Sequence, residues 1–274
     1  MTEERVGWIG LGSIGLPMAR TLQRKGYQVT VVGHLRREPV EAMKRDGAKE
    51  ANSPRELAKE CQIIFSMVWN REQTEEVVFG SNGLWQELGA DHTLILCSTL
   101  TPDFCSELAK RAKNEKAVEV LDAPVSGMPW GAEAGTLTFM VGGSEVAYQR
   151  CRRFFEAMGK NIFYTGKSGT GQAAKLVNQL MFIINASAAL EGLSLANKAG
   201  LDTHTMLEIA KVSTGDSWAM HNYDNLIQLF KNLSKTHLSA GSKDLIYALE
   251  FAGRNSLHLP IAGLVAQLEV KLPE

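Results

Sequence analysis

Short apolar runs alternate with stretches of helical period in the first part of the chain. The segments 5–9 (RVGWI) and 28–32 (QVTVV) predict strands, and apolar residues at helical spacing predict a helix over 14–25 that ends at Gly26. Further strands are predicted in QIIFSMV, TLILCST, AVEVLDAPV, GTLTFMVGG and NIFYTG, with a helix over 145–158 between the last two. Such alternation is typical of an α/β fold with a Rossmann-type, doubly wound parallel sheet, and we expect mixed strands at its far edge.

Capping signals mark where several helices begin. Ser53 followed by Pro54, with Glu56 three residues after the cap, predicts one helix start, and Asn70 with Gln73 predicts another. The Thr-Pro pair at the head of TPDFCSELAKRA predicts a third.

The pattern changes at the glycine-rich stretch GKSGTGQ, residues 166–172. Beyond it we find helical periods: a long helix over 171–198, then shorter helices with breaks near Gly200, Gly215 and Pro260. The sequence therefore predicts two domains joined by a long helix, a dinucleotide-binding Rossmann domain over 1–166 and an all-α substrate or dimerisation domain over 167–274.

Composition narrows the class of protein. Of the 274 residues, 45% are hydrophobic and 22% are charged, and the formal net charge is −1. These values fit a globular protein with a substantial core and no general attraction to nucleic acid or an anionic membrane. The apolar run LVNQLMFIINASAAL contains three amide side chains, which favours a buried helix over a membrane span.

The start of the chain and its cysteines indicate a compartment. A strand is predicted almost at once, leaving no room for a signal peptide. Cysteines at positions 61, 97, 105 and 151 lack metal-ligand spacing, so we expect reduced thiols in a cytoplasmic protein. The six histidines are dispersed, with neither cysteine nor acid at ligand spacing, so no metal site is expected.

The stretch GWIGLGSIGLPMAR carries a candidate cofactor site. It has the G-x-G-x-x-G spacing directly after a predicted strand and at the start of a predicted helix, formed by Gly10, Leu11, Gly12, Ser13, Ile14 and Gly15. In a dinucleotide-binding turn the glycines allow a tight turn, close approach of the pyrophosphate and close helix packing, while the helix N-terminus offers amide donors. Glycine-rich turns are also common without a ligand.

The end of the second predicted strand bears on which dinucleotide is bound. A carboxylate there would accept hydrogen bonds from the adenine ribose and repel a 2′-phosphate. This chain has Gly33, followed by His34, Arg36 and Arg37, which favours NADP, with NAD as the alternative. In the competing interpretation, the two arginines only solvate a helix start.

Two further stretches carry candidate catalytic chemistry. Lys175, Asn178 and Gln179 lie at i, i+3 and i+4 on one face of the long helix, where a lysine can act as general acid toward a carbonyl oxygen. In DAPVSGMPWGAEAGTL, the hydroxyl of Ser126 and the amides after it predict a small cradle for a substrate carboxylate. A solvated surface lysine and an ordinary Pro/Gly loop are the alternatives.

Together these stretches resemble the β-hydroxyacid dehydrogenase family, which includes 3-hydroxyisobutyrate dehydrogenases and semialdehyde reductases. The matching motifs, in order along nearly the whole chain, are GWIGLGSIGLPMA, CST at 97–99, LDAPVSG with GTL at 135–137, GTGQAAKLVNQ and SKDL at 242–245. The resemblance implies a Rossmann domain followed by a helical domain, an NAD(P)-dependent oxidoreductase acting on a small carboxylate-bearing aldehyde or hydroxy acid, and a homodimer or homotetramer.

The resemblance also implies a role for each matching position. Lys175 would be the proton donor, with Asn178 and Gln179 orienting the substrate, and Lys243 would close over cofactor or substrate, while Asp244 would be structural. The glycine turn would cradle the pyrophosphate, with Val68, Asn70 and Thr99 along the cofactor. Ser126, Gly127, Met128 and Trp218 would contact the substrate.

This chain departs from the family pattern at several positions. Met128 replaces a second glycine, Trp69 replaces a proline, and Gly33 replaces the usual cofactor-selecting residue, while the chain stops at Glu274, where relatives continue for about another helix. Two rival functions remain at this point. Met128 and Trp218 are compatible with an imine reductase of related fold, and a catalytically silent dinucleotide-binding scaffold is the other alternative.

Overall fold

We describe a computed structural model that covers residues 4–33, 36–232 and 242–268. Its contacts divide the chain into two compact units, Met1–Lys175 and Leu176–Glu274. The expected boundary after residue 166 lies a few residues before this division. Each unit is described by itself.

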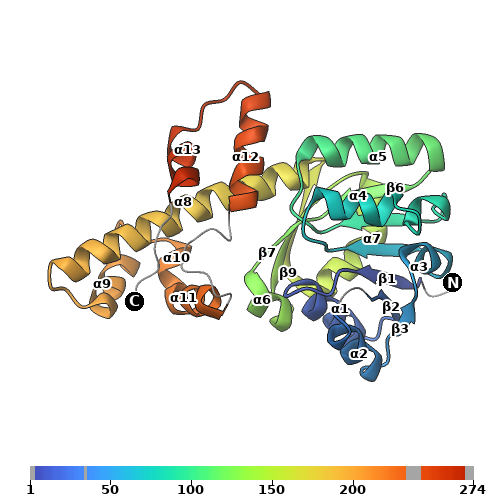
Figure 1. The fold of residues 1–274 in the computed structure, drawn as a ribbon, viewed down its shortest axis with the longest axis horizontal. Helices are drawn as coiled ribbons and strands as arrows, with labels where there is room; N and C mark the ends of the chain where they lie inside the picture. Colours follow the sequence, from blue (N-terminus) through green and yellow to red (C-terminus); the bar gives the residue numbers. More distant parts are fainter. Residues whose placement is uncertain (1–3, 34–35, 233–241, 269–274) are drawn as a thin grey trace. The chain divides into compact units, whose positions relative to one another are not determined.

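The first unit contains a nine-stranded sheet with the order β3-β2-β1-β4-β5-β6-β8-β7, and β9 pairs with β8 (Figure 1). The first six strands in this order, from β3 at the edge to β6, are parallel. Strand β8 runs antiparallel to β6, and β9 is parallel to β8. The doubly wound sheet and its mixed far edge are thereby confirmed. The strands are β1 Val6–Ile9, β2 Val29–Val32, β3 Lys49–Ala51, β4 Ile63–Ser66, β5 Thr93–Leu96, β6 Glu119–Asp122, β7 Val125–Ser126, β8 Leu137–Gly142 and β9 Gly159–Gly166.

Helices cover both faces of this sheet (Figure 1). They are α1 Gly15–Arg24, α2 Glu38–Arg45, α3 Pro54–Glu60, α4 Arg71–Phe79, α5 Pro102–Lys116, α6 Met128–Ala134 and α7 Glu145–Met158, with a 3-10 turn at Leu84–Gln86. The predicted caps are present at two of them: Ser53 accepts from the amide of Glu56, and Asn70 accepts from the amide of Gln73. Thr101 precedes α5 without a side-chain cap.

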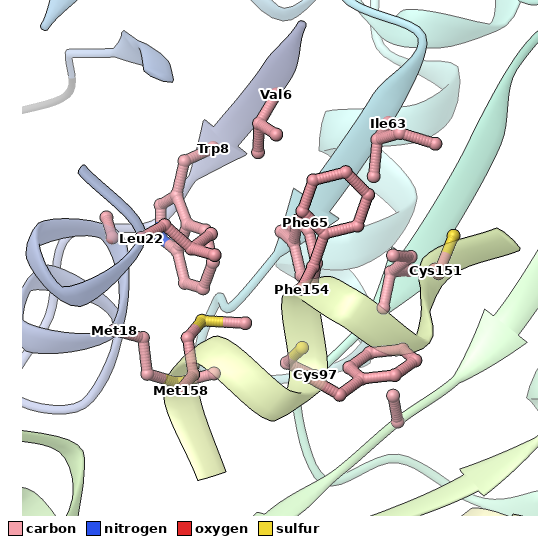
Figure 2. Close-up of a cluster of buried hydrophobic side chains, with 14 of the residues drawn as sticks. Val6, Trp8, Met18, Leu22, Ile63, Phe65, Cys97, Cys151, Phe154 and Met158 are labelled. Atoms are coloured by element: carbon pink, nitrogen blue, oxygen red, sulfur yellow. The ribbon is translucent and has the colours of Figure 1, made fainter. Parts of the chain in front are cut away.

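Alternate residues of the strands feed two separate cores. Figure 2 shows the core on the side of α1 and α7, where Trp8 stacks on Phe65 at 5.0 Å and Phe154 meets Phe65 edge-on at 6.3 Å. The second core, on the side of α3 to α5, includes Ile64, whose side chain points away from the first because successive strand residues alternate. The four cysteines are free and buried.

The second unit is helical in its described residues. Helix α8, Thr170–Lys198, begins in the first unit and continues into the second, followed by α9 Thr203–Lys211, α10 Trp218–His221, α11 Tyr223–Asn232, α12 Ser242–Arg254 and α13 Pro260–Gln267. Ile183 of α8, Leu245 of α12 and Ala262 of α13 form a buried hydrophobic cluster in this unit.

Helix α8 departs from one sequence expectation. It has 29 residues, and its most apolar 18-residue window has a mean hydropathy of 1.3, so by length and composition alone it meets the requirement for crossing a membrane. The polar residues of the run do not disqualify it, because its apolar residues outweigh them. Core helices of globular proteins pass the same test, and 39% of this window is buried.

Candidate functional site

The carboxyl ends of four parallel strands bring the candidate cofactor residues to one edge of the sheet. Ile9 of β1 pairs with Ser66 of β4, Ser66 with Leu96 of β5, and Leu96 with Asp122 of β6. The loops that follow these residues therefore start side by side, which is where open α/β sheets bind ligands.

Two glycines of the G-x-G-x-x-G turn are required by the protein's own packing. Gly10 has φ +97°, and a Cβ there would lie 2.2 Å from the carbonyl oxygen of Met67. A Cβ at Gly15 would lie 2.0 Å from the carbonyl oxygen of Gly10. The indole Nε1 of Trp8 donates to that same carbonyl at 3.0 Å, which fixes the turn to the core.

Gly12 is different, because a Cβ there would meet nothing within 4 Å. Gly12 and Ser13 are exposed, Leu11 is half-buried, and Ile14 precedes α1 without a side-chain cap. The first turn of α1 carries no acidic residue. An uncapped helix start beside open space above a glycine fits the pyrophosphate of a dinucleotide, because backbone amides there can face the phosphates.

Near the end of β2 the structure brings together a cluster of charged side chains from α2, β3 and the residue before α2. The guanidinium of Arg37 forms an ion pair with Glu50 of β3, Nη1 to Oε1 at 2.6 Å and Nη2 to Oε2 at 3.0 Å. Glu41 accepts a further hydrogen bond from Nη2 at 2.8 Å. Arg36 is exposed and forms no ion pair with another residue of the described ranges, while His34 lies outside them.

Arg37 and the carboxylates of this cluster each stabilise the charged form of the other. The hydrogen bond from Arg37 lowers the pKa of the Glu50 carboxyl to about 2, with Lys44 contributing to the same direction. The bonds to Glu50 and Glu41 raise the pKa of Arg37. Both groups of the ion pair are therefore charged at neutral pH.

The loops after β4 and β5 are held by hydrogen bonds to each other. The amide of Val68 donates to Ser98 Oγ at 3.0 Å, and the side chain of Asn70 caps α4. The buried side chain of Gln172, in the first turn of α8, bridges the two residues that flank Thr99. Its Nε2 donates to the carbonyl of Ser98 at 2.8 Å, and its Oε1 accepts from the amide of Leu100 at 2.9 Å.

Asp122, at the end of β6, links the start of α8 to the sheet through hydrogen bonds. Its carboxylate accepts from the amide of Gly169 at 2.8 Å and from the amide of Gln172 at 2.9 Å, and the residue is only 1% exposed. Burial raises the pKa of Asp122 to about 6, although the amide donors oppose the shift. Lys175 follows Gln172 on the same helix and is buried, with 7% exposure.

The predicted carboxylate loop has an unusual backbone. Ser126 ends β7, where it pairs with Thr138, and Gly127 has φ +137°. Met128 has φ +61°, in the left-handed region that favours glycine. Met128, which stands where the family has a second glycine, therefore has a backbone conformation that favours glycine.

Other predicted residues lie in the second unit. Gln179 Nε2 donates to Asp244 at 2.8 Å, and Asn178 donates to Gln179 at 3.4 Å. The ammonium of Lys243 lies 3.6 Å from the Asp244 carboxylate. Trp218 begins α10, packs edge-on against Phe182 and is 47% exposed.

Sequence reasoning missed three residues of these clusters. Glu50, Asp122 and Gln172 act through contacts between segments that lie far apart in sequence, and only the position of Gln172 beside Lys175 offered a local signal. In the described ranges, no group of three or more His, Cys, Asp or Glu side chains is placed to hold a metal ion.

Two matches to known families define the class of protein. Residues 5–166 match the NAD binding domain of 6-phosphogluconate dehydrogenase, and residues 169–272 match the NAD-binding region of NADP-dependent 3-hydroxyisobutyrate dehydrogenase. The chain is an NAD(P)-dependent dehydrogenase that uses a nicotinamide dinucleotide. It belongs to the β-hydroxyacid dehydrogenase family.

Relatives and solved structures agree with this assignment. The chain is 39% identical over 223 residues to a probable mitochondrial 3-hydroxyisobutyrate dehydrogenase of Dictyostelium discoideum, covering 81% of this chain and 69% of the relative. It is 32% identical to an NAD-dependent L-serine dehydrogenase of Pseudomonas aeruginosa, covering 97% and 91%. The crystal structure of 3-hydroxyisobutyrate dehydrogenase from Salmonella typhimurium superposes with a TM-score of 0.83 at 27% identity, covering 96% and 92%.

An imine reductase from Streptomyces aurantiacus shares the fold, with a TM-score of 0.71 over 96% of this chain and 92% of that one. Its sequence identity is 18%, so the likeness extends to the fold alone.

Proposed function

We propose that this enzyme uses NADPH to reduce a small aldehyde or keto acid that bears a carboxylate, and oxidises the corresponding hydroxy acid in reverse. Lys175 is the general acid. The observation that carries this proposal is the burial of the Lys175 side chain, three residues beyond Gln172 on α8. The side-chain amide of Gln172 forms hydrogen bonds with the backbone on both sides of Thr99. A lysine tied so closely to the cofactor edge is suited to a fixed proton transfer.

The residues of the first unit divide the work of binding. Backbone amides of Ser13 and its neighbours hold the pyrophosphate, and Val68, Asn70 and Thr99 line the path toward the nicotinamide. Ser126 and Gly127 hold the substrate carboxylate. Bound NADPH supplies the hydride, while Lys175 donates a proton to the carbonyl oxygen and accepts it in the reverse direction. In the second unit, Asp244 has a structural role: it accepts a hydrogen bond from Gln179 and lies 3.6 Å from the ammonium of Lys243.

The preference for NADPH rests on the charges at the end of β2. Glu50 and Glu41 are neutralised by Arg37 and Lys44, and Arg36 adds an exposed positive charge without a partner in the described ranges. An adenosine 2′-phosphate is favoured by this balance, because the carboxylates of Glu41 and Glu50 are both engaged by cations and are poorly placed to accept hydrogen bonds from the ribose hydroxyls of NADH.

A steady-state assay of NADPH oxidation against a panel of small aldehydes, keto acids and cyclic imines tests the proposal. We expect turnover of the carboxylate-bearing carbonyls and a loss of about 10²–10⁴-fold in kcat for Lys175→Ala. Lys175→Arg keeps the positive charge but holds its proton too tightly to donate it, so it should be equally impaired. Lys167→Ala removes an exposed lysine nearby in sequence and serves as the control.

Three results would contradict the proposal. Unchanged turnover in Lys175→Ala would remove the proton-donor role, and turnover of imines alone would favour imine reduction. Binding of NADPH without turnover of any compound in the panel would favour the silent scaffold.

We also propose a homo-oligomer in the cytoplasm. Val177 and Met181 of α8, and Ile261 and Leu264 of α13, expose apolar side chains that a second copy could cover. Light scattering on the purified protein tests the association, and a monomer at micromolar concentration would exclude it. The four free, buried thiols suit a reducing compartment, which fractionation of source cells would test.

A further inference from the structure

The end of β2 contains a carboxylate that the local sequence does not reveal. The residue at the strand end is Gly33, but Glu50 reaches the same place from the neighbouring strand β3, where it pairs with Val31. A Cβ at Gly33 would lie 3.0 Å from Oε1 of Glu50 and 2.6 Å from Nη1 of Arg37. The ion pair therefore fills the space that a side chain at position 33 would occupy.

The ion pair has an inner and an outer member. The side chain of Glu50 is 20% exposed, whereas that of Arg37 is 53% exposed. Both carboxylate oxygens of Glu50 accept from Arg37, and Oε2 also lies 3.2 Å from the ammonium of Lys44. These oxygens are already engaged, so they are poorly suited to accept hydrogen bonds from a ribose. The guanidinium is the group presented to a ligand.

Arg37 retains donors for such a ligand. A guanidinium has about five N–H donors, and hydrogen bonds to Glu50 and Glu41 use three of those of Arg37. The bidentate geometry holds the planar fork in one orientation. An arginine that is already ordered loses less conformational entropy when it binds an oxyanion than one that moves freely.

We propose that Glu50 is a positioning residue for the adenosine 2′-phosphate of the cofactor: it holds Arg37 in the space left by Gly33. This inference rests on the proposed preference for NADPH. It assigns the selectivity to a residue of β3, and gives Gly33 the role of making room for the ion pair.

The proposal predicts an effect opposite in sign to simple charge repulsion. If Glu50 acted only as a negative charge near a phosphate, its removal would strengthen phosphate binding. If it orders Arg37, its removal weakens phosphate binding even though a repulsive charge is lost. The direction of the change therefore separates the two explanations.

Calorimetric titration with 2′,5′-ADP and 5′-AMP measures this directly, without turnover. We expect Arg37→Ala to weaken 2′,5′-ADP at least about tenfold and to leave 5′-AMP within about twofold, as for loss of a hydrogen bond to a charged group. Glu50→Gln should weaken 2′,5′-ADP about three- to tenfold. The double variant should be no weaker than Arg37→Ala, because Glu50 acts through Arg37.

Two further variants serve as controls. Glu50→Asp keeps the charge but withdraws the carboxylate by one methylene, so positioning predicts weaker 2′,5′-ADP binding and charge alone predicts no change. It also replaces Glu50→Gln if that variant fails to fold. Glu87→Gln breaks another ion pair, 2.7 Å long, whose partner Arg55 makes no contact with Arg37 or Glu50 in the ion pairs of the described residues, and should leave both nucleotides unaffected.

Several results would overturn the inference. Tighter 2′,5′-ADP binding in Glu50→Gln would leave only a charge effect, and an equal loss for 5′-AMP would make Glu50 a ribose ligand. Additive losses in the double variant would show that Glu50 does not act through Arg37. Equal affinity of the wild-type enzyme for the two nucleotides would instead remove the NADPH preference, and this inference with it.

Discussion

Replacing Asp122 by asparagine tests how the start of α8 is attached to the sheet. The wild-type carboxylate accepts two backbone hydrogen bonds, from Gly169 and Gln172, in a site that is 1% exposed. An amide of the same shape can accept only one of them and presents its NH₂ group to the other donor. Asp122→Asn therefore loses an acceptor at every pH, while the loss of a titrating group changes how stability depends on pH.

The pH-dependent part follows from the pKa of Asp122. Burial raises it from 3.8 to about 6, so between these values the folded protein binds more protons than the unfolded chain. The free energy of unfolding contributed by Asp122 therefore rises as pH falls through 6, by about 1.4 kcal/mol between pH 7 and pH 5. Asparagine contributes nothing in this range, so the wild type should gain that amount over the variant.

Urea denaturation of both proteins at pH 7 and pH 5 measures the difference. The difference in unfolding free energy between the wild type and Asp122→Asn should be larger at pH 5 than at pH 7. A difference that stays constant or becomes smaller at pH 5 would refute the raised pKa of Asp122, and with it the view that burial outweighs the amide donors. Glu87→Gln is the control, because the hydrogen bond from Arg55 lowers the pKa of Glu87. The difference in unfolding free energy between the wild type and Glu87→Gln should stay nearly constant from pH 7 to pH 5 and become smaller only below pH 5.

Two further predictions concern the glycine turn and the carboxylate loop. Gly12→Ala should keep the melting temperature of the wild type but bind NADPH at least about tenfold more weakly. Gly15→Ala should melt at a lower temperature, because its Cβ would lie 2.0 Å from the carbonyl oxygen of Gly10. Equal melting temperatures for the two variants would contradict this prediction. Met128→Gly relieves about 1–2 kcal/mol of left-handed strain, offset by about 0.5–1 kcal/mol of chain entropy. The unfolding free energy of Met128→Gly should not fall, while its kcat/KM for carboxylate substrates changes. Ala117→Gly, at φ +57° in the C-terminal cap of α5, is the control and should leave kcat/KM unchanged.

Much of the first unit could be predicted because the signals are local. Helix α7 spans Glu145–Met158 as expected, and the caps at Ser53 and Asn70 follow from residues within one turn. Alternating apolar runs predicted most strands and helices in their order, since each strand needs only its own pattern to bury a face. The short strand β3 and the helices α2 and α6 were not predicted, and the single strand expected in AVEVLDAPV is divided into β6 and β7. The long helix α8 was recognised in the same way.

The contacts that assemble the site could not be predicted from such patterns. The partner of Arg37 comes from β3, thirteen residues away, and Gln172 reaches the backbone beside Thr99, more than seventy residues away. Which side chains meet across strands depends on register and on the twist of the sheet. The absence of an acid at Gly33 directed attention to this place, but the sequence could not show that the side chain of Glu50 reaches it from the neighbouring strand β3.

The glycine turn illustrates how structure sharpens a weak motif. Three glycines at the right spacing could all be explained by tight packing, and for Gly10 and Gly15 the packing explanation is sufficient. Gly12 has open space where a side chain would be, so the fold itself does not require a glycine there. A residue whose small size serves no internal contact, beside an uncapped helix start, is best explained by a ligand that approaches the backbone. The cofactor assignment therefore gains most from the one glycine that the protein's own packing does not need.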